Sequence, residues 1–269
     1  MKYNVECIAC GTCYNECVLQ KNAITKKANG IEIDLSACNA CGHCVAVCPT
    51  GALKDHPRSA LQSACGAPLP PEEMLRALRY PRSVRHFSDK LVPRAVMEQL
   101  LDAGRYTQTA GNYQRIGYLV LSGRENVQKV ADLYEELVLS LPDDDPKKAG
   151  WLGPIRKRER GVEDGLFYGC SQLIFETCGK DHWDAQRSPL LCQHYLALMA
   201  PSLGLGTCWS GQMESLMAYK DFGERFAKLV GLEEDKKLCG CLMVGYPTVQ
   251  FHRLVARNPL EVSWRGEEI

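Results

Sequence analysis

The chain has 269 residues, enough for about two domains of average size. Lys plus Arg and Asp plus Glu each total 32, so the formal net charge is zero. This balance gives no general attraction to nucleic acid or to an acidic membrane surface. Hydrophobic residues make up 45% and charged residues 24%, which excludes extensive disorder, collagen-like repeats and coiled coil for most of the chain. Cysteine departs from this average composition, with 15 residues.

The N-terminal segment has one Lys but lacks the apolar core of a secretory signal. No stretch reaches the roughly 18 apolar residues of a membrane-spanning helix. We therefore expect a cytoplasmic protein with no membrane partner and no nucleic-acid partner. Because the cytoplasm keeps thiols reduced and the number of cysteines is odd, clustered cysteines indicate metal binding here and not disulfides.

The first 48 residues contain two copies of one cysteine pattern, C-x2-C-x2-C-x3-C. The eight residues are Cys7, Cys10, Cys13 and Cys17, then Cys38, Cys41, Cys44 and Cys48. The pattern resembles the bacterial ferredoxin run, in which the fourth cysteine binds the other of two clusters. We therefore predict two [4Fe-4S] clusters. Their ligands are Cys7, Cys10, Cys13 and Cys48 for the first, and Cys38, Cys41, Cys44 and Cys17 for the second.

Structural zinc is the alternative interpretation of these cysteines, since Zn²⁺ takes four ligands from CxxC pairs. Eight thiolates in a twofold pattern exceed that need, which favours the clusters. Pro49 follows the second run as in ferredoxins, whereas Val18 follows the first; this departure affects a turn and not a ligand. Between the runs, Asn29-Gly30 lies between short β-prone segments and predicts a β-hairpin.

The other seven cysteines are scattered and lack ligand spacing. We interpret them as small buried hydrophobic residues, with a third metal site as the less favoured alternative. They are Cys65, Cys170, Cys178, Cys192, Cys208, Cys239 and Cys241.

Composition divides the chain into a ferredoxin-type domain at 1–58, a linker rich in Pro, Gly and small residues at 59–71, and a second domain at 72–269. Hydrophobic periodicity predicts an α+β sandwich for the second domain, a small sheet with helices on both faces. The predicted helices are 70–80, 92–106, 125–139 and an apolar helix that starts near 188 and ends at Gly204; the predicted strands are 116–123, 172–178 and 241–246.

Residues 141–161 lack periodicity, and we expect them to form an exposed insertion. The basic run Arg156–Arg160 within this segment is interpreted as a solvated face, with docking of an acidic partner as the alternative. The segment GLGTCWSG at 204–211 follows a helix and not a strand, so it does not indicate a nicotinamide dinucleotide site. No P-loop is present.

Four motifs of the second domain occur in a distinctive order. They are RSVRHF at 82–87, AGNYQ at 110–114, GLGTCWSG at 204–211, and GYP at 245–247 followed by Arg253 and Arg257. In this order and at these distances, the set resembles the FMN-dependent nitroreductase family over residues 72–269. With the cysteine runs, the whole chain resembles a ferredoxin–nitroreductase fusion. The resemblance implies an FMN-dependent oxidoreductase that forms an intimate homodimer with FMN at the subunit interface.

The resemblance also implies which residues contact the flavin phosphate and ribityl chain. Arg82, Ser83 and Arg85 match the family's phosphate segment, although Pro81 stands where the family often has Arg. Arg257 matches a C-terminal phosphate contact, and Arg253 is the second choice. Arginine suits a dianionic phosphate because its guanidinium donates two parallel hydrogen bonds. The alternative for each is an ordinary surface charge.

The flavin ring would contact two further segments in the family pattern. Asn112 and Gln114 match an amide pair at the pyrimidine edge, with a simple turn as the alternative. Around the N5 and O4 edge the family presents backbone N–H groups, which stabilise negative charge on the reduced ring. The matching residues are Cys208, Trp209, Ser210 and Gly211; Trp209 is equally consistent with a core position.

These elements predict an electron-transport enzyme. Electrons would pass from an external low-potential donor, a ferredoxin or similar protein, through the two clusters to FMN. FMN would then reduce a small organic acceptor such as a nitro compound, a quinone or an enone. The alternatives are a non-catalytic electron-transfer or redox-sensing flavoprotein and an enzyme that remodels a flavin or cofactor. No catalytic side chain is predicted, because His86, His182, His194 and His252 are isolated in sequence.

Overall fold

The structure is a computed structural model that describes residues 6–59, 66–162 and 164–266. Part of the linker predicted at 59–71 lies outside the described residues, and Cys65 lies outside them as well. Among the described residues, no helix is both long and apolar enough to cross a membrane.

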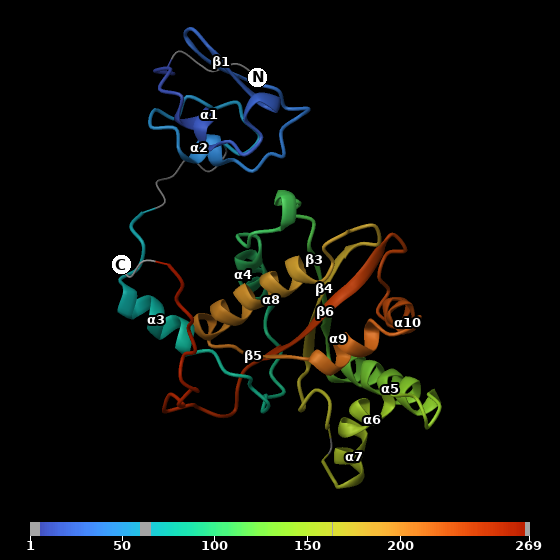
Figure 1. Cartoon of the computed structure of the whole chain (residues 1–269). Coiled ribbons are helices and arrows are strands. Elements are labelled where there is room, and N and C mark those ends of the chain that lie inside the picture. The colour runs from blue at the N-terminus through green and yellow to red at the C-terminus, as the bar shows by residue number, and fades with distance from the viewer. Residues whose placement is uncertain (1–5, 60–65, 163, 267–269) are drawn as a thin grey trace.

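The N-terminal part is a small domain built on one β-hairpin (Figure 1). Its elements are α1 (Thr12–Glu16), η1 (Gln20–Asn22), β1 (Ile24–Lys27), β2 (Gly30–Ile33) and α2 (His43–Ala46). The strands pair antiparallel from Ile24 opposite Ile33 to Lys27 opposite Gly30, which confirms the hairpin predicted at Asn29-Gly30. Its core contains Ile24, Ile31, Ile33, Cys44 and Leu53.

The second part contains a four-stranded antiparallel sheet in the order β3-β4-β6-β5. The strands are β3 (Gly117–Ser122), β4 (Gln172–Gly179), β5 (Gly206–Trp209) and β6 (Lys236–Gly245). The remaining elements are α3 (Pro71–Arg79), α4 (Arg94–Gly104), η2 (Ala110–Asn112), α5 (Arg124–Ser140), α6 (Lys148–Trp151), α7 (Gly153–Glu159), α8 (Arg187–Met199), η3 (Ala200–Leu203), α9 (Gly211–Met217) and α10 (Phe222–Leu229).

Helices cover both faces of this sheet and form two hydrophobic cores. On one face, α4 and α8 pack Leu100 and Leu196 against Ile174 and Leu242. On the other face, α5, α9 and α10 pack side chains such as Phe226 against Phe175. The α+β sandwich predicted from hydrophobic periodicity is confirmed, because alternate residues of β4 face different helices.

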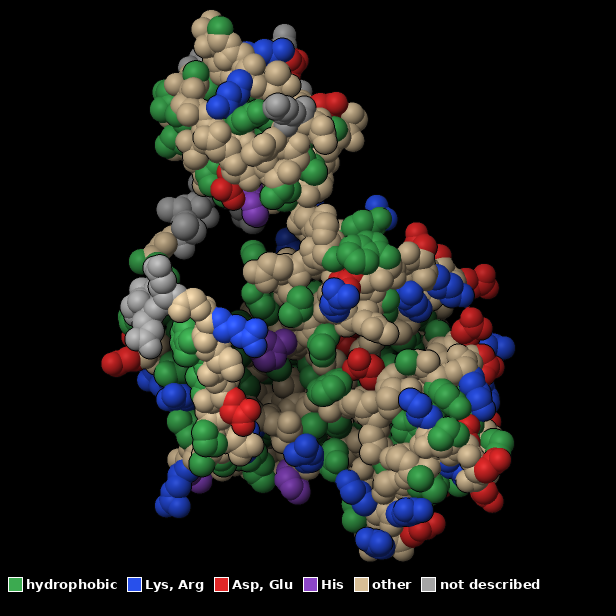
Figure 2. Space-filling view, in the orientation of Figure 1, with side chains coloured by type: hydrophobic (Ala, Val, Ile, Leu, Met, Phe, Trp, Pro, Cys, Tyr) green, Lys and Arg blue, Asp and Glu red, His purple; other side chains and the backbone are tan. Residues whose placement is uncertain are grey.

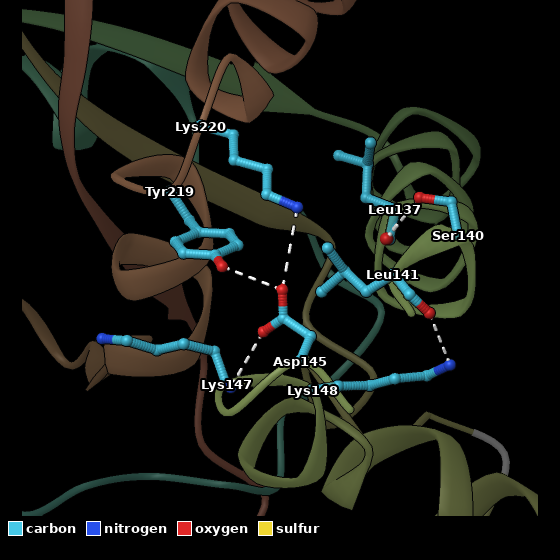
Figure 3. A network of polar contacts seen from close by, with 8 residues as sticks. All are labelled: Leu137, Ser140, Leu141, Asp145, Lys147, Lys148, Tyr219 and Lys220. Atoms are coloured by element: carbon cyan, nitrogen blue, oxygen red, sulfur yellow. Dashed lines mark hydrogen bonds and ion pairs between the residues drawn. The ribbon is translucent and has the colours of Figure 1, made fainter. Parts of the chain in front are cut away.

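The prediction of an exposed insertion at 141–161 is only partly correct, because Arg156–Arg160 are exposed whereas Trp151 and Ile155 are buried. This segment forms α6 and α7, and Trp151 and Ile155 join the core beneath α5. Asp145 anchors it, since its carboxylate accepts hydrogen bonds from the Lys147 N–H and the Tyr219 hydroxyl (Figure 3). Two short helices, the second of which begins with Gly153-Pro154, give no sustained period of 3.6, so their burial had no clear sequence signal.

The apolar helix predicted to end at Gly204 is confirmed as α8 followed by η3. Gly204 ends it with a φ of 71°, a left-handed conformation that glycine adopts without strain. Leu190 and Leu191 on α8 remain about half exposed, so this helix keeps an apolar side free in the single chain.

On the face seen in Figure 2, acidic and basic side chains intermix over α5 to α10.

Glu176 is an unusual core residue, because its carboxyl group is fully buried in β4. One carboxyl oxygen accepts a hydrogen bond from Gln193, and the other has no hydrogen-bond partner. Burial raises the pKa of Glu176 from 4.5 to about 8. The folded chain therefore holds this proton more tightly than the unfolded chain does.

We predict that Glu176→Gln removes a pH dependence of stability. In the natural chain this contribution is fully present below a pH of about 4.5 and is lost as pH rises towards 8. The neutral amide has no charge to bury, so the variant should unfold at a higher temperature than the natural chain above pH 8. Thermal unfolding across this pH range checks it, with exposed Glu98→Gln as the control. Parallel pH profiles for the natural chain and Glu176→Gln would contradict it.

Candidate functional site

The two cysteine runs fold into the same local backbone. Ala9 and Ala40 occupy matching positions and have φ values of 55° and 52°, and the matching Gly11 and Gly42 have 77° and 80°. A short helix, α1 or α2, begins directly after each glycine. The sequence repeat is therefore also a repeat in structure, and each copy wraps three cysteines around a turn.

The thiols predicted to hold the first cluster line a single cavity. They are Cys7, Cys10, Cys13 and Cys48. Three come from the first run and the fourth comes from the second, as the ferredoxin pattern requires. The Ala52 N–H donates to the Cys48 sulfur at 3.3 Å, a type of contact that stabilises negative charge on a ligating sulfur.

Three of the four cysteines predicted for the second cluster lie in or against the N-terminal core, namely Cys17, Cys38 and Cys44. Burial raises the pKa of Cys44 to about 11, and the nearby Cys38 and Cys41 act in the same direction. Cys17 and Cys38 pack against the same core, and the Ala40 N–H donates to the Cys38 sulfur at 3.3 Å. A metal cluster would offset the cost of gathering these thiolates, because its positive charge keeps them deprotonated.

In the part of the chain that the structure describes, no three His, Cys, Asp or Glu side chains are placed to hold one ion. The four cysteines of the first set line one cavity together with apolar residues such as Ile31 and Leu53. Away from the two runs, the Cys178 and Cys239 sulfurs lie 3.0 Å apart across β4 and β6 without a third ligand.

The RSVRHF segment lies along the outer edge of the sheet beside β5. Ser83 forms a parallel bridge with Thr207, and the Val84 N–H donates to the Thr207 carbonyl at 2.9 Å. Further on, Phe87 bridges Pro247. The GLGTCWSG and GYP motifs thus both contact the RSVRHF segment. These three motifs lie together in the fold although they are far apart in the sequence.

This packing brings Ser83 and Arg85 close to Cys208. Burial raises the pKa of Cys208, whereas the Arg85 guanidinium and a hydrogen bond with Ser83 act in the opposite direction. A cavity of about 310 Å³ lies beside Arg82, between β5 and residues 247–251. Of these residues, Arg82 lines the cavity, and its guanidinium can donate hydrogen bonds to a phosphate group there.

Aromatic rings hold these arginines in place, and sequence analysis did not identify them. The Arg82 guanidinium lies 5.5 Å from the Phe251 ring centre, and that of Arg85 lies 5.8 Å from the ring of Tyr168. Tyr168 belongs to none of the four motifs, so no local pattern indicated it. Arg253 and Arg257 are exposed on the C-terminal segment, and Phe251 brings that segment close to Arg82.

Trp209, Ser210 and Gly211 form the junction between β5 and α9. The Ser210 N–H donates to the Cys241 carbonyl within the sheet, whereas Gly211 starts the helix, where N–H groups have no partner within the helix. The Trp209 ring packs over Gly211 and its Nε1 donates to Glu214 at 2.6 Å. An open cavity of about 1310 Å³ is lined by this junction and by Leu190 of α8.

Asn112 and Gln114 lie at the other end of the sheet. Gly117 of β3, which follows their turn, pairs with Thr177 of β4, and Thr177 pairs with Leu238 of β6. Thr207 of β5 pairs with Val244, six residues further along β6. This register separates the two segments by roughly 20 Å along the strands, and they also lie on opposite edges of the sheet. Within one chain, the structure does not bring the amide pair to the arginine segment.

Comparison with known proteins agrees with both halves of this description. Residues 78–246, more than half of the chain, match the model of the nitroreductase family, and residues 6–52 match the 4Fe-4S dicluster domain. A protein of Methanothermobacter thermautotrophicus described as an NADH dehydrogenase/NAD(P)H nitroreductase is 22% identical over 175 residues, which cover 65% of this chain and 78% of that protein.

Solved structures show the same fold for the second part. A Bacteroides fragilis nitroreductase with bound FMN has a TM-score of 0.57 at 19% identity, over 71% of this chain and 98% of that one. A Desulfitobacterium hafniense nitroreductase with bound FMN has a TM-score of 0.56 at 20% identity, over 70% and 98%. The chain therefore belongs to the nitroreductase family, as an oxidoreductase of that type with an N-terminal 4Fe-4S dicluster domain.

Proposed function

We propose that this chain binds two [4Fe-4S] clusters and FMN, and that it passes single electrons from a ferredoxin or similar low-potential donor through the clusters to FMN. The final acceptor is a small organic molecule, such as a nitro compound, a quinone or an enone. The observation that carries the proposal is the cavity lined by three thiols of the first run and Cys48 of the second, in one chain with a nitroreductase domain.

The residues present suit both groups. The predicted cluster ligands all lie in the N-terminal domain, which we place at 1–58. FMN would bind to the second domain, which we place at 72–269. When bound, clusters supply one-electron transfer and FMN combines two such electrons into a hydride equivalent. Arg82, Ser83 and Arg85 would neutralise the phosphate. The first N–H groups of α9, at Gly211, would face the ring edge where negative charge develops.

A second copy of the chain would complete the flavin site. The arginine segment and the Asn112–Gln114 pair lie on opposite edges of the sheet, farther apart than one flavin ring can reach. Apolar groups in the single chain also remain uncovered, since Leu190 and Leu191 of α8 are about half exposed and Leu260 and Trp264 are each 89% exposed. A homodimer that joins opposite ends of two sheets would bring the two segments together and cover apolar surface.

A small-molecule acceptor fits this site better than a second electron-transfer protein does. The open cavity of about 1310 Å³ reaches Trp209 and Gly211, so a small organic molecule can approach the junction where the flavin edge would lie. Proton delivery needs no dedicated side chain in this proposal, because water can enter the open cavity.

We predict that Cys48→Ser removes one of two clusters. The natural chain, purified without oxygen, should hold about eight iron and about eight sulfide atoms, and the variant about half of each. Cys192→Ser is the matched control, because Cys192 is buried on α8 outside the two runs. Iron and sulfide analysis measures the result. Zinc in place of iron in the natural chain would contradict the assignment.

We predict that Arg85→Ala weakens FMN binding by roughly tenfold to a hundredfold, the usual loss for one charged hydrogen bond to a phosphate. Quenching of FMN fluorescence during titration measures the affinity. Arg94→Ala is the control, since Arg94 is exposed on α4 and pairs with Glu98. Equal affinities of Arg85→Ala and the natural chain would remove Arg85 from the phosphate site.

We also predict that a reduced bacterial-type ferredoxin bleaches first the cluster absorbance and then the flavin absorbance of the holoprotein, without NADH or NADPH. Anaerobic stopped-flow spectroscopy follows both signals. The proposed path runs through the clusters, so the cluster signal should change before the flavin signal. Clusters that become reduced while the flavin stays oxidised would show that the proposed path does not operate.

A further inference from the structure

We infer that electrons leave the N-terminal domain through the second cluster, and that they reach the FMN anchored by the partner copy of the chain. The inference deepens the proposed function and rests on it. It assigns each cluster a place in the path and predicts that the two halves of one chain serve different flavins.

A hydrogen bond joins the loop of the second cluster to the nitroreductase domain. The Asn112 side-chain amide donates to the backbone carbonyl of Asn39 at 3.0 Å. Asn39 lies between Cys38 and Cys41 in the sequence, and its own side chain accepts the Cys41 N–H at 3.3 Å. The contact therefore ends on the turn that carries two predicted ligands of the second cluster.

Hydrogen bonds within the turn that carries Asn112 orient its side chain for this contact. Gln114 Nε2 donates to Asn112 Oδ1 at 2.6 Å, which leaves the amide nitrogen of Asn112 free to point at Asn39. Asn112 and Gln114 have φ values of 57° and 50°, a region that side chains other than Gly rarely adopt. Two further hydrogen bonds stabilise this turn. The Thr109 hydroxyl accepts from the Gln114 N–H, and the hydroxyl of Ser188, at the start of α8, accepts from the Ala110 N–H.

The exposure of the two ligand sets gives the path its direction. Cys10 of the first set is exposed, whereas Cys44 of the second set is buried. An external protein donor needs an accessible cluster edge, and the first cluster offers it at Cys10. The second cluster lies towards Asn112, which the family pattern places at the pyrimidine edge of the flavin.

The flavin that Asn112 would contact belongs to the partner. Ser188, at the start of α8, is bonded to the Asn112 turn, whereas β5 follows the far end of that helix and the arginine segment lies beside β5. Thirteen residues of α8 span about 20 Å, in agreement with the register of the sheet. A flavin at Asn112 must therefore be anchored by Arg82, Ser83 and Arg85 of a second copy.

The electron balance closes with the donor named above. Two one-electron oxidations of the external ferredoxin supply two electrons, each of which passes through the first cluster and then the second. Bound FMN would take up both electrons with one proton from water, and both clusters would return to their oxidised state. No other oxidant or reductant is needed.

Mixed dimers test the assignment of partners. A split dimer has Cys41→Ser in one chain and Arg82→Ala with Arg85→Ala in the other, purified through two different affinity tags. A combined dimer has all three substitutions in one chain and a natural partner. Delivery between chains predicts that the split dimer reduces about half of the natural flavin amplitude, since one of two sites stays intact, and that the combined dimer reduces almost none. The opposite pattern overturns the inference.

A second readout does not depend on electron transfer. Asn112→Asp replaces the amide donor by an acceptor, tolerates the left-handed turn and leaves the cluster ligands in place. Paired with a chain carrying Arg82→Ala and Arg85→Ala, it should give one high-affinity FMN site per dimer, because one site keeps both intact segments. Two sites of equally reduced affinity would place both segments in one chain's site and overturn the inference, as would a chain that stays monomeric.

The experiments also separate this inference from the proposed function. If the natural dimer fails to reduce its flavin from the clusters, the electron path is wrong, whereas FMN stoichiometry still assigns the segments to one chain or two. The cluster order has its own test. In Cys10→Ser, which retains the second cluster, Asn112→Asp should slow flavin reduction by photochemically injected electrons at least several-fold. If that rate is unchanged by Asn112→Asp, the second cluster is not the exit.

Discussion

A [4Fe-4S] cluster needs four thiolates around one cavity, yet each cysteine turn of this chain can place only three side by side. The fourth must come from elsewhere, and the chain solves this by folding two copies of one turn against each other across a hairpin. Cys48 thereby joins Cys7, Cys10 and Cys13 around one space. The pairing of β1 with β2 brings the turns together, so the small hydrophobic core of this domain and its ligand geometry depend on each other.

Much of this arrangement could be predicted from the residues alone, because the decisive signals are local. A spacing of two residues between cysteines, Asn-Gly between β-prone segments and Gly after an apolar helix each specify a backbone shape within a few residues. The same holds for β4, whose alternation distributes Ile174 and Phe175 to different faces. The two strongest predictions, the hairpin and the sandwich, rest on such signals.

The features that could not be predicted depend on contacts between distant segments. Trp151 is buried because α6 packs beneath α5, and nothing in residues 141–161 reveals that partner. Tyr168 and Phe251 contact guanidinium groups that lie far away in sequence. The bond from Asn112 to Asn39 joins two domains. In each case the sequence shows a residue type suited to burial or to hydrogen bonding, whereas only the fold supplies its neighbour.

The C-terminal segment has a consequence for the life of a newly made subunit. Leu260 and Trp264 are almost fully exposed in the single chain, and covering each would contribute about 1.5–3 kcal/mol. A chain outside the proposed homodimer would expose these apolar side chains to unrelated hydrophobic groups. Pairing soon after synthesis would therefore protect the protein from aggregation as well as complete its chemistry, and low expression would leave a larger share of chains in the vulnerable form.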